Sequence, residues 1–231
     1  MYCTITIARY PKYLGIIGLL SMAIFRIPLT FNKDVNFWKL LGCGKNGTFD
    51  IVPDWRQWCV LRVHSELKQS EYLDRFIKKW YKIFKAEVYT IVLKSIEGHG
   101  TWDKFEFVNA QEPKIEHAGT IAVLTRASIK ISKLKSFWKN VKPVAKQMND
   151  SEGFIFSIGL GEIPFIKQAT LSFWESKQHM QQFAYKMHVH KNVVKLTHKE
   201  KWYSEEMFVR FDPISASGTL NGGNPLSGIF Q

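Results

Sequence analysis

Residues 187–199 carry three histidines, and one of them has surroundings that suit a metal ligand. At about 100° per residue, a helix over this segment places three apolar residues on one arc: Val189, Val193 and Leu196. Three lysines fall nearly opposite this arc: Lys191, Lys195 and Lys199. His188 shares the lysine side, whereas His190 shares a mostly apolar flank with Met187 and Val194. A neutral imidazole among apolar side chains suits an axial ligand of haem iron, so the pattern makes His190 the candidate.

A histidine hydrogen-bonded in the core, or at its edge, explains the same pattern. On the pattern alone this second interpretation is the stronger one, because a single histidine is weak evidence for a ligand. The remaining histidines show no ligand spacing such as HExxH: His64, His99, His117, His179 and His198. The GLGE motif with Gly159 and Gly161 has incomplete spacing for a phosphate loop and indicates a tight turn between strands. The sequence contains no nucleophile elbow, so no catalytic residue is assigned.

Two predicted strands near the C-terminus each have one purely apolar face and one mixed face. In residues 168–174 the mixed face carries Gln168 and Trp174, and in residues 206–211 it carries Arg210. We expect the apolar faces to lie under helices and the mixed faces to point into the space between two sheets. Side chains of these kinds indicate a ligand cavity, so Gln168, Trp174 and Arg210 are predicted to bind the cofactor. The alternative is an open sheet whose polar face meets solvent.

The predicted elements follow the order βαββαβ in the second half of the chain, which is the ferredoxin-like unit. Its strands are predicted over residues 119–125, 154–160, 168–174 and 207–214, and its helices over residues 132–148, 176–185 and 187–199. The first half repeats the GxG turn, the intervening strand, the charged helix start and the apolar helix. Its strands are predicted over residues 4–8, 37–41, 58–63 and 88–96, and its helices over residues 11–26 and 70–84. Pro28 is expected to stop the first helix.

These patterns predict an α+β fold of two ferredoxin-like halves, residues 1–112 and residues 113–231. The halves are expected to meet near the polar stretch at residues 98–116. Two such units can pair their sheets face to face, which gives a dimeric α/β barrel formed by a single chain. A length of 231 residues with 45% hydrophobic residues is enough for the core that this architecture needs.

The net charge of +12 is unevenly distributed along the chain. Residues 117–149 contain seven basic residues and no acid. Such a surface attracts nucleic acid, anionic membrane or an acidic protein, although a solvated basic face explains it equally well. Zinc-finger spacing, an RNP-like strand and a recognition helix are absent from the sequence, so nucleic acid is not an expected partner. We expect this stretch and the lysines of residues 187–199 to bind an acidic electron donor or anionic lipid.

The cysteines and the apolar N-terminal run indicate in which cellular compartment the protein is expected. Cys3, Cys43 and Cys59 are odd in number and form no CxxC pair, which favours a reducing, cytoplasmic compartment. The uncharged run at residues 13–25 is too short to span a bilayer and lacks the cleavage site of a signal peptide. A buried helix is the favoured interpretation. The alternative is a helix that touches lipid and holds the protein peripherally at the inner membrane.

Several segments along nearly the whole chain resemble the spheroidene monooxygenase family. In the N-terminal half they are RYPKYLG, MAIFRIPL, FWKLLGCGKNGTF and PDWRQW. In the C-terminal half they are IAVLTRASI, FWKNVKPV, GFIFSIGLGEIP, QATLSFW, FAY followed by a histidine, and WYSEEMFVRF with SGTL after it. Each segment is weak alone, but their shared order is specific. The histidine between FAY and WYSEE matches His190, which the resemblance implies as the axial ligand of haem iron.

The resemblance implies a haem-containing carotenoid ketolase with a dimeric α/β-barrel fold. Haem b would activate O₂ with electrons from a ferredoxin-type donor, and the substrate would be a long polyene such as an acyclic carotenoid. Oxygen insertion at an allylic carbon, followed by a second round, would give a ketone. Three alternatives stay open: a haem-binding barrel without hydroxylase activity, a monooxygenase acting on another apolar substrate, and a basic interaction module that binds neither.

Overall fold

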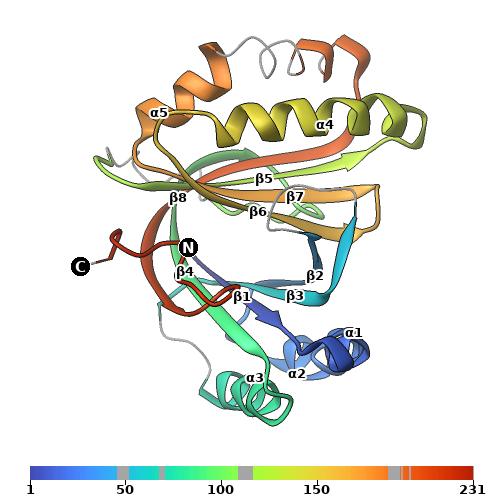
Figure 1. Cartoon of the computed structure of the whole chain (residues 1–231), viewed down its shortest axis with the longest axis vertical. Helices are drawn as coiled ribbons and strands as arrows, with labels where there is room; N and C mark the ends of the chain where they lie inside the picture. The colour runs from blue at the N-terminus through green and yellow to red at the C-terminus, as the bar shows by residue number, and fades with distance from the viewer. Residues whose placement is uncertain are drawn as a thin grey trace.

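The computed structural model describes residues 1–45, 52–67, 71–108, 117–186, 193, 195–197 and 199–230. These residues form a closed barrel of antiparallel strands in the order β1-β3-β2-β6-β7-β5-β8-β4. The strands are β1 (Tyr2–Arg9), β2 (Phe37–Gly44), β3 (Pro53–His64), β4 (Glu87–Gly100), β5 (Ile121–Ile129), β6 (Phe154–Ile163), β7 (Lys167–Trp174) and β8 (Tyr203–Gly218). In Figure 1 the barrel lies between two groups of helices.

Each half of the chain contributes four neighbouring strands with the same connectivity. Strands β1 to β4 are arranged in the order β4-β1-β3-β2, and strands β5 to β8 in the order β8-β5-β7-β6. The βαββαβ unit therefore occurs twice, which confirms the predicted α+β fold and its dimeric α/β-barrel architecture in one chain. The boundary expected between residues 112 and 113 lies outside the described residues.

The two halves meet at two junctions of unequal length. Strand β4 pairs with β8 along its length from Tyr89 to Gly100, whereas β2 and β6 pair only through Gly42 and Cys43. The long junction depends on glycine. A Cβ on Gly100, whose φ is +76°, would stand 2.1 Å from the carbonyl oxygen of Glu206 on β8. The backbones of β4 and β8 can approach this closely only because no side chain intervenes.

Helices cover the outer faces of both sheets. The first half carries α1 (Gly15–Ile24), α2 (Arg26–Phe31) and α3 (Glu71–Ile83), and the second carries α4 (Leu134–Asn149) and α5 (Lys177–Gln181). Short 3₁₀ turns precede α1 and α4, and a π-helical turn follows α5: Lys12–Leu14, Ile131–Lys133 and Gln182–Lys186. Contrary to the prediction, Pro28 does not stop the helical segment. It is the third residue of α2, where an N–H would have had no helical partner.

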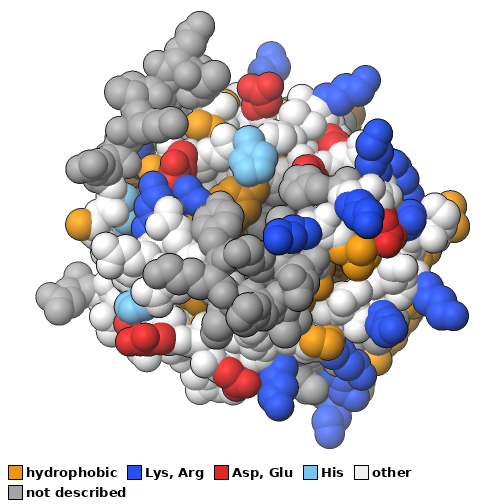
Figure 2. Space-filling view, turned by 90° about the horizontal axis from the view of Figure 1, so that it is seen from above, with side chains coloured by type: hydrophobic (Ala, Val, Ile, Leu, Met, Phe, Trp, Pro, Cys, Tyr) orange, Lys and Arg blue, Asp and Glu red, His pale blue; other side chains and the backbone are white. Residues whose placement is uncertain are grey.

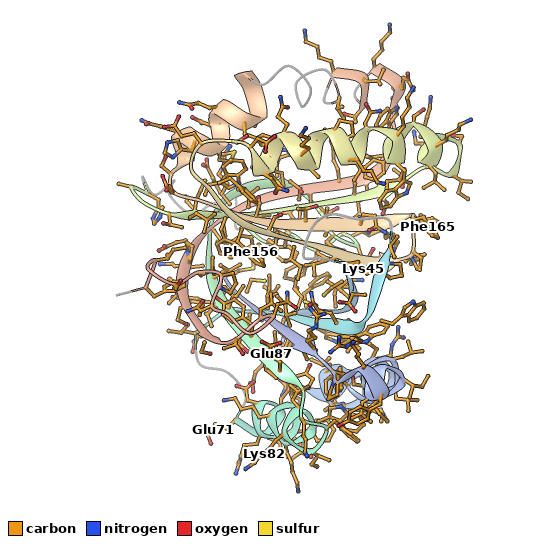
Figure 3. All side chains as sticks on the ribbon, viewed as in Figure 1. Lys45, Glu71, Lys82, Glu87, Phe156 and Phe165 are labelled. Carbon is orange, nitrogen blue, oxygen red and sulfur yellow. The ribbon has the colours of Figure 1, made fainter. Side chains whose placement is uncertain are left out.

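Apolar side chains fill the barrel interior, as Figure 3 shows between the two sheets. The strands contribute Ile5, Ile7, Leu61, Ile91, Leu124, Leu171, Phe173, Val209 and Phe211 to this core. The predicted strand faces are therefore corrected. The apolar face with Leu171 points into the barrel, and the mixed face with Gln168 points toward the helices. Because closure removes the inner face of the strands from water, that face is mainly apolar, and charged side chains on it need partners of opposite charge.

The helix layers outside the two sheets differ in packing. In the first half, the Phe25 ring meets the rings of Phe76, Trp80 and Tyr81 edge to face, with centroids 5.6 to 5.9 Å apart. The Trp80 indole N–H donates to the Tyr10 hydroxyl at 3.0 Å. In the second half, the buried cluster between sheet and helices is smaller: Ile121, Val123, Met148, Trp174, Met180 and Phe183. A cavity lies beside this second cluster.

Candidate functional site

The cavity has a volume of about 350 Å³ and lies between the second sheet and its helices. Strands β5, β7 and β8 form its floor, and α4, α5, Val193 and Thr197 cover it. Six apolar side chains make up much of its wall: Val123, Val144, Met148, Trp174, Met180 and Phe183. A largely apolar pocket with a few polar groups is the usual form of a site for an apolar ligand.

Two of the residues predicted to bind the cofactor, Trp174 and Gln168, line this cavity. The Trp174 ring stacks on Phe183 at 5.1 Å, and its indole N–H donates to Oγ of Ser172 at 3.0 Å. These contacts fix the orientation of the indole. The Gln168 amide nitrogen donates to the carbonyl oxygen of Ile163 at 3.2 Å. Trp174 is six steps along β7 from Gln168, so the floor is roughly 20 Å long by strand rise.

Arg210, also predicted to bind the cofactor, is not among the residues that line the cavity. Its register partner on β4 is Glu97, and Nη1 of Arg210 donates to Oε1 of Glu97 at 2.5 Å. The Arg210 guanidinium also lies 5.0 Å from the ring centroid of Phe208, which does line the cavity. Arg210 therefore lies beside the cavity, where the carboxylate on the neighbouring strand binds its guanidinium, and its role in cofactor binding stays a prediction.

Glu97 connects this strand pair to helix α5. Nζ of Lys177, the first residue of α5, lies 2.7 Å from Oε1 of Glu97. Burial would raise the pKa of Glu97, but the hydrogen bonds from Lys177 and Arg210 outweigh it and hold the pKa below its usual value. Glu97 is therefore ionised at neutral pH and fixes the start of α5 at one end of the cavity.

The predicted iron ligand His190 and its neighbour His188 lie outside the described residues. The nearest described residues on either side that line the cavity are Ala184, Val193 and Thr197. Among the described histidines, His99 is the one that lines the cavity, and its side chain is exposed. The part of the chain that the structure describes contains no group of three or more His, Cys, Asp or Glu side chains arranged for a metal ion.

Tyr203, the first residue of β8, lines the cavity and was missed from the sequence. Burial raises the pKa of Tyr203 strongly, and the negative charge of Glu206 adds to this effect. The phenol therefore stays protonated and can donate a hydrogen bond. Its ring meets Phe137 of α4 edge to face, with centroids 6.2 Å apart. Because Tyr203 lies at the very start of a strand, alternation alone could not assign it to a face.

Asn140 was also missed, although the sequence carried a signal for it. Helix α4 presents an inward stripe at helical spacing: Phe137, Asn140, Val141, Val144 and Met148. Asn140 is the one amide on this otherwise apolar stripe, and an amide on a buried helix face marks a partner or a cavity. Its Nδ2 donates to the carbonyl oxygen of Ser136 at 2.8 Å.

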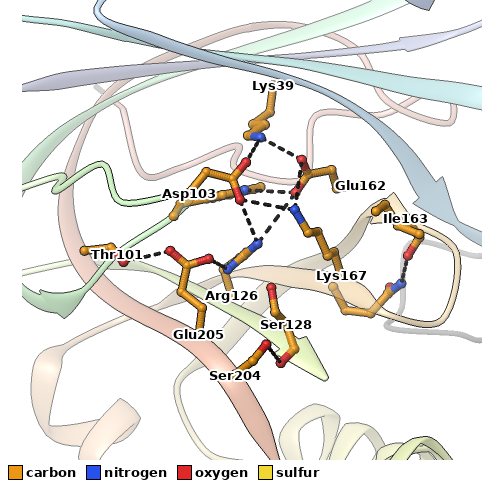
Figure 4. Close-up of polar contacts among 12 residues, drawn as sticks. Lys39, Thr101, Asp103, Arg126, Ser128, Glu162, Ile163, Lys167, Ser204 and Glu205 are labelled. Atoms are coloured by element: carbon orange, nitrogen blue, oxygen red, sulfur yellow. Dashed lines mark hydrogen bonds and ion pairs between the residues drawn. The ribbon is translucent and has the colours of Figure 1, made fainter. Parts of the chain in front are cut away.

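A network of charged side chains lies at one end of the barrel interior, next to the cavity (Figure 4). It consists of Lys39, Asp103, Arg126, Glu162, Lys167 and Glu205. The Arg126 side chain is 1% exposed; it pairs with Glu205 and, at 3.4 Å, with Asp103. Burial would raise the pKa of Asp103, but hydrogen bonds from Lys39 and Lys167 hold it low. Each member pairs with an opposite charge, so the network is structural.

The outer surface of α4 is basic, as predicted. Exposed lysines follow this helix and the segment beside it: Lys135, Lys139, Lys142, Lys146, Lys195 and Lys199. Figure 2 looks onto this side and shows Lys and Arg side chains gathered along one flank. Lys133 is different, because its Nζ pairs with Glu200 at 3.0 Å. Lys191 lies outside the described residues, and the partner of this surface stays a prediction.

The fold and the cavity together define a one-chain dimeric α/β barrel with an apolar pocket on the helix side of its second half. A crystal structure of aldoxime dehydratase (OxdRE) in complex with butyraldoxime is similar, with a TM-score of 0.59 and 7% sequence identity. The match covers 93% of this chain and 79% of that chain. At this identity the likeness concerns the fold alone. No protein-family model matches the chain.

Three curated proteins, all named spheroidene monooxygenase, are similar to most of the chain. The protein of Rubrivivax gelatinosus is 30% identical over 84% of this chain and 75% of its own length. The protein of Cereibacter sphaeroides is 29% identical over 94% of this chain and 67% of its own length. The protein of Rhodobacter capsulatus is 28% identical over 90% of this chain and 87% of its own length. The chain therefore belongs to the spheroidene monooxygenase family, as its segments suggested, and is by that membership a monooxygenase.

Proposed function

We propose that this protein is a haem-dependent monooxygenase that introduces a keto group into an acyclic carotenoid. Haem b would bind in the cavity between the second sheet and its helices, and His190 would hold the iron. The observation that carries the proposal is the hollow second helix layer, in a chain whose two halves otherwise share one plan. The three relatives named spheroidene monooxygenase support a carotenoid as the substrate.

The residues that line the cavity fit a haem. The macrocycle is flat and apolar, and the wall offers the stacked rings of Trp174 and Phe183 together with aliphatic side chains. Polar side chains that can donate hydrogen bonds to the haem carboxylates also line the cavity: Asn140, Gln168 and Tyr203. In the sequence, His190 lies between Ala184 and Val193, which both line the cavity, and this supports His190 as the iron ligand.

When bound, haem would supply the activation of O₂, with two electrons and two protons per round to place one oxygen atom in a C–H bond and release the other as water. Two rounds at one carbon leave a geminal diol, which loses water to give the ketone. The chain supplies the surroundings of the reacting carbon. Its apolar wall excludes water, and Tyr203 keeps its proton on the phenol oxygen as a hydrogen-bond donor. The long floor along β7 supports an extended substrate.

The basic surface of α4 supports a ferredoxin-type electron donor as the partner. Val144 and Met148 of this helix line the cavity, while Lys139 and Lys142 are exposed on its outer side. An acidic protein bound to these lysines would be separated from the cofactor by a single helix, about 10 Å thick. Exposed charges are screened over about 10 Å at ~0.1 M ionic strength. We therefore expect the rate of reduction by the donor to fall steeply with added salt.

The test is an absorption spectrum of the protein expressed with a haem supply, followed by incubation with an acyclic carotenoid, O₂ and a reduced ferredoxin. A Soret band together with a keto product supports the proposal. A Soret band without any product identifies a haem-binding barrel without hydroxylase activity. Oxidation of a different apolar compound reassigns the substrate. If no Soret band forms, haem is not the cofactor and the proposal fails.

A further inference from the structure

The outward side of helices α1 and α2 carries an apolar strip. Its members recur at helical spacing: Tyr13, Ile16, Leu20, Ala23, Ile27 and Phe31. Tyr13 is 75% exposed and Phe31 80% exposed, and Ile16 and Ile27 lie between these ends at 64% and 65%. Trp55, itself 63% exposed, lies at the start of the strip, since a Cβ on Gly15 would stand 3.5 Å from its carbonyl oxygen. Apolar side chains gathered this way on a surface indicate an interaction site.

The charged side chains within the segment that carries the strip, residues 12–33, are all basic. Lys12, Arg26 and Lys33 are exposed along it, and the sequence contains no Asp or Glu before Asp34. An anionic bilayer surface matches this combination. Its headgroups attract Lys and Arg, its acyl boundary accepts aliphatic side chains, and tyrosine and tryptophan rings favour the level between them.

The segment is held flat against the barrel. Lys12–Phe31 spans 20 residues and is long and apolar enough to cross a membrane. Its inner side, however, packs on the sheet and α3 through Met22, Phe25 and Leu29. A Cβ on Gly18 would stand 2.4 Å from the Trp58 indole nitrogen, so α1 lies directly on β3. Crossing a membrane would expose this core, whereas lying on a membrane leaves it intact.

We propose that the apolar strip binds the surface of an anionic lipid bilayer, with α1 and α2 lying in the plane of that surface. This inference goes beyond the proposed oxidation and stands without it, because it requires neither cofactor nor substrate. A second copy of the chain is the less suitable occupant. A two-fold contact through the strip would bring Lys12, Arg26 and Lys33 of both copies together without a neighbouring acid of this segment.

The experiment measures co-sedimentation of the purified protein with vesicles of phosphatidylcholine, alone or mixed with phosphatidylglycerol. The test variant combines Ile16→Gln, Leu20→Gln and Ile27→Gln, since glutamine keeps the helix propensity. We expect its binding to mixed vesicles to weaken at least about tenfold, because three aliphatic side chains no longer leave water. The control variant combines Tyr72→Gln, Ile83→Gln and Ile131→Gln, which are similarly exposed but lie off the strip, and should bind like the wild type.

A second variant tests the charges. Lys12→Gln, Arg26→Gln and Lys33→Gln together should remove the preference for mixed over phosphatidylcholine vesicles. Circular dichroism and thermal unfolding establish that each variant is folded. Three results would overturn the proposal: a wild type that stays in the supernatant with both vesicles, an equal loss in the control variant, or test-variant binding equal to the wild type. A wild-type dimer that the test variant converts to monomer in sedimentation velocity would assign the strip to a second copy instead.

Discussion

The helix layers of the two halves follow one plan but are packed differently. In the first half, Phe25 contacts three aromatic rings of α3, and the layer is dense. In the second half, the corresponding space holds a cavity of about 350 Å³. The helices explain the difference. Over the first sheet, α1, α2 and α3 pack together through these rings, whereas over the second sheet α4, α5, Val193 and Thr197 border an open space. The first layer stabilises the fold, and the second leaves room for a ligand.

The largest effect that we expect concerns the ligand of the second layer. His190→Ala should abolish the Soret band, or nearly so, while far-ultraviolet circular dichroism stays unchanged, because an iron ligand is lost with little core volume. His188→Ala is the matched control and should leave the band nearly unchanged. The reverse result would assign the iron to His188. Two unchanged spectra would place the haem elsewhere or exclude it as the cofactor.

Large-to-small substitutions compare the two layers in stability. Phe25→Ala should lower the free energy of unfolding by about 3–5 kcal/mol, because a fully buried ring leaves a void in a dense cluster. Phe183→Ala should lower it by about 1–2 kcal/mol less, since one side of the Phe183 ring already borders the cavity. Urea denaturation followed by tryptophan fluorescence measures both. Equal losses would mean that the second layer is as tightly packed as the first.

Small-to-large substitutions provide the opposite comparison. Gly18→Ala places a Cβ 2.4 Å from the Trp58 indole nitrogen, and the overpacking should destabilise the protein by about 1–3 kcal/mol despite the better helix propensity of alanine. Ala145→Leu adds volume toward the cavity and should change stability by less than about 0.5 kcal/mol while reducing bound haem. If Gly18→Ala left stability unchanged and Ala145→Leu lowered it, the first helix layer would be the loosely packed one and the second the dense one.

The smallest effect concerns the ion pairs that hold α5 over the cavity. The pKa of Glu97 is depressed in the folded state, so its stabilisation is complete above the ordinary value of 4.5 and is lost as the pH falls through the lower folded value. Glu97→Gln should therefore destabilise the protein at neutral pH by about 1 kcal/mol or less, since Lys177 is partly exposed. Below about pH 4 the difference should shrink. A difference independent of pH would point to packing rather than charge.

The repeated βαββαβ order could be predicted because periodicity is local. The sequence could not show which strand faces point into the barrel and which point toward the helices. Alternation shows that Gln168 and Trp174 share a face, but closure of the barrel depends on junctions between distant strands, such as β4 with β8. In the closed barrel the apolar faces point into the interior and the mixed faces point toward the helices. The bond between Arg210 and Glu97 could not be predicted for the same reason, because Glu97 lies 113 residues away in the sequence.

The candidate site was partly predictable. Trp174 and Gln168 could be predicted as lining residues because strand alternation puts them together on the mixed face of β7, and this face borders the cavity. Tyr203 was not predicted as a lining residue because it is the first residue of its strand. Its raised pKa depends on burial, which a short sequence pattern does not show. His190 stays a prediction, since it lies outside the described residues.

The covalent link between the two halves has a consequence for how such a site can change. In a barrel assembled from two identical chains, every substitution occurs twice, so any change that hollows one layer hollows the other as well. In this chain each layer is encoded separately. A mutation that widens the pocket of the second half leaves the Phe25 cluster of the first half untouched. Pocket shape can therefore vary from one family member to the next without a matching loss of stability in the opposite half.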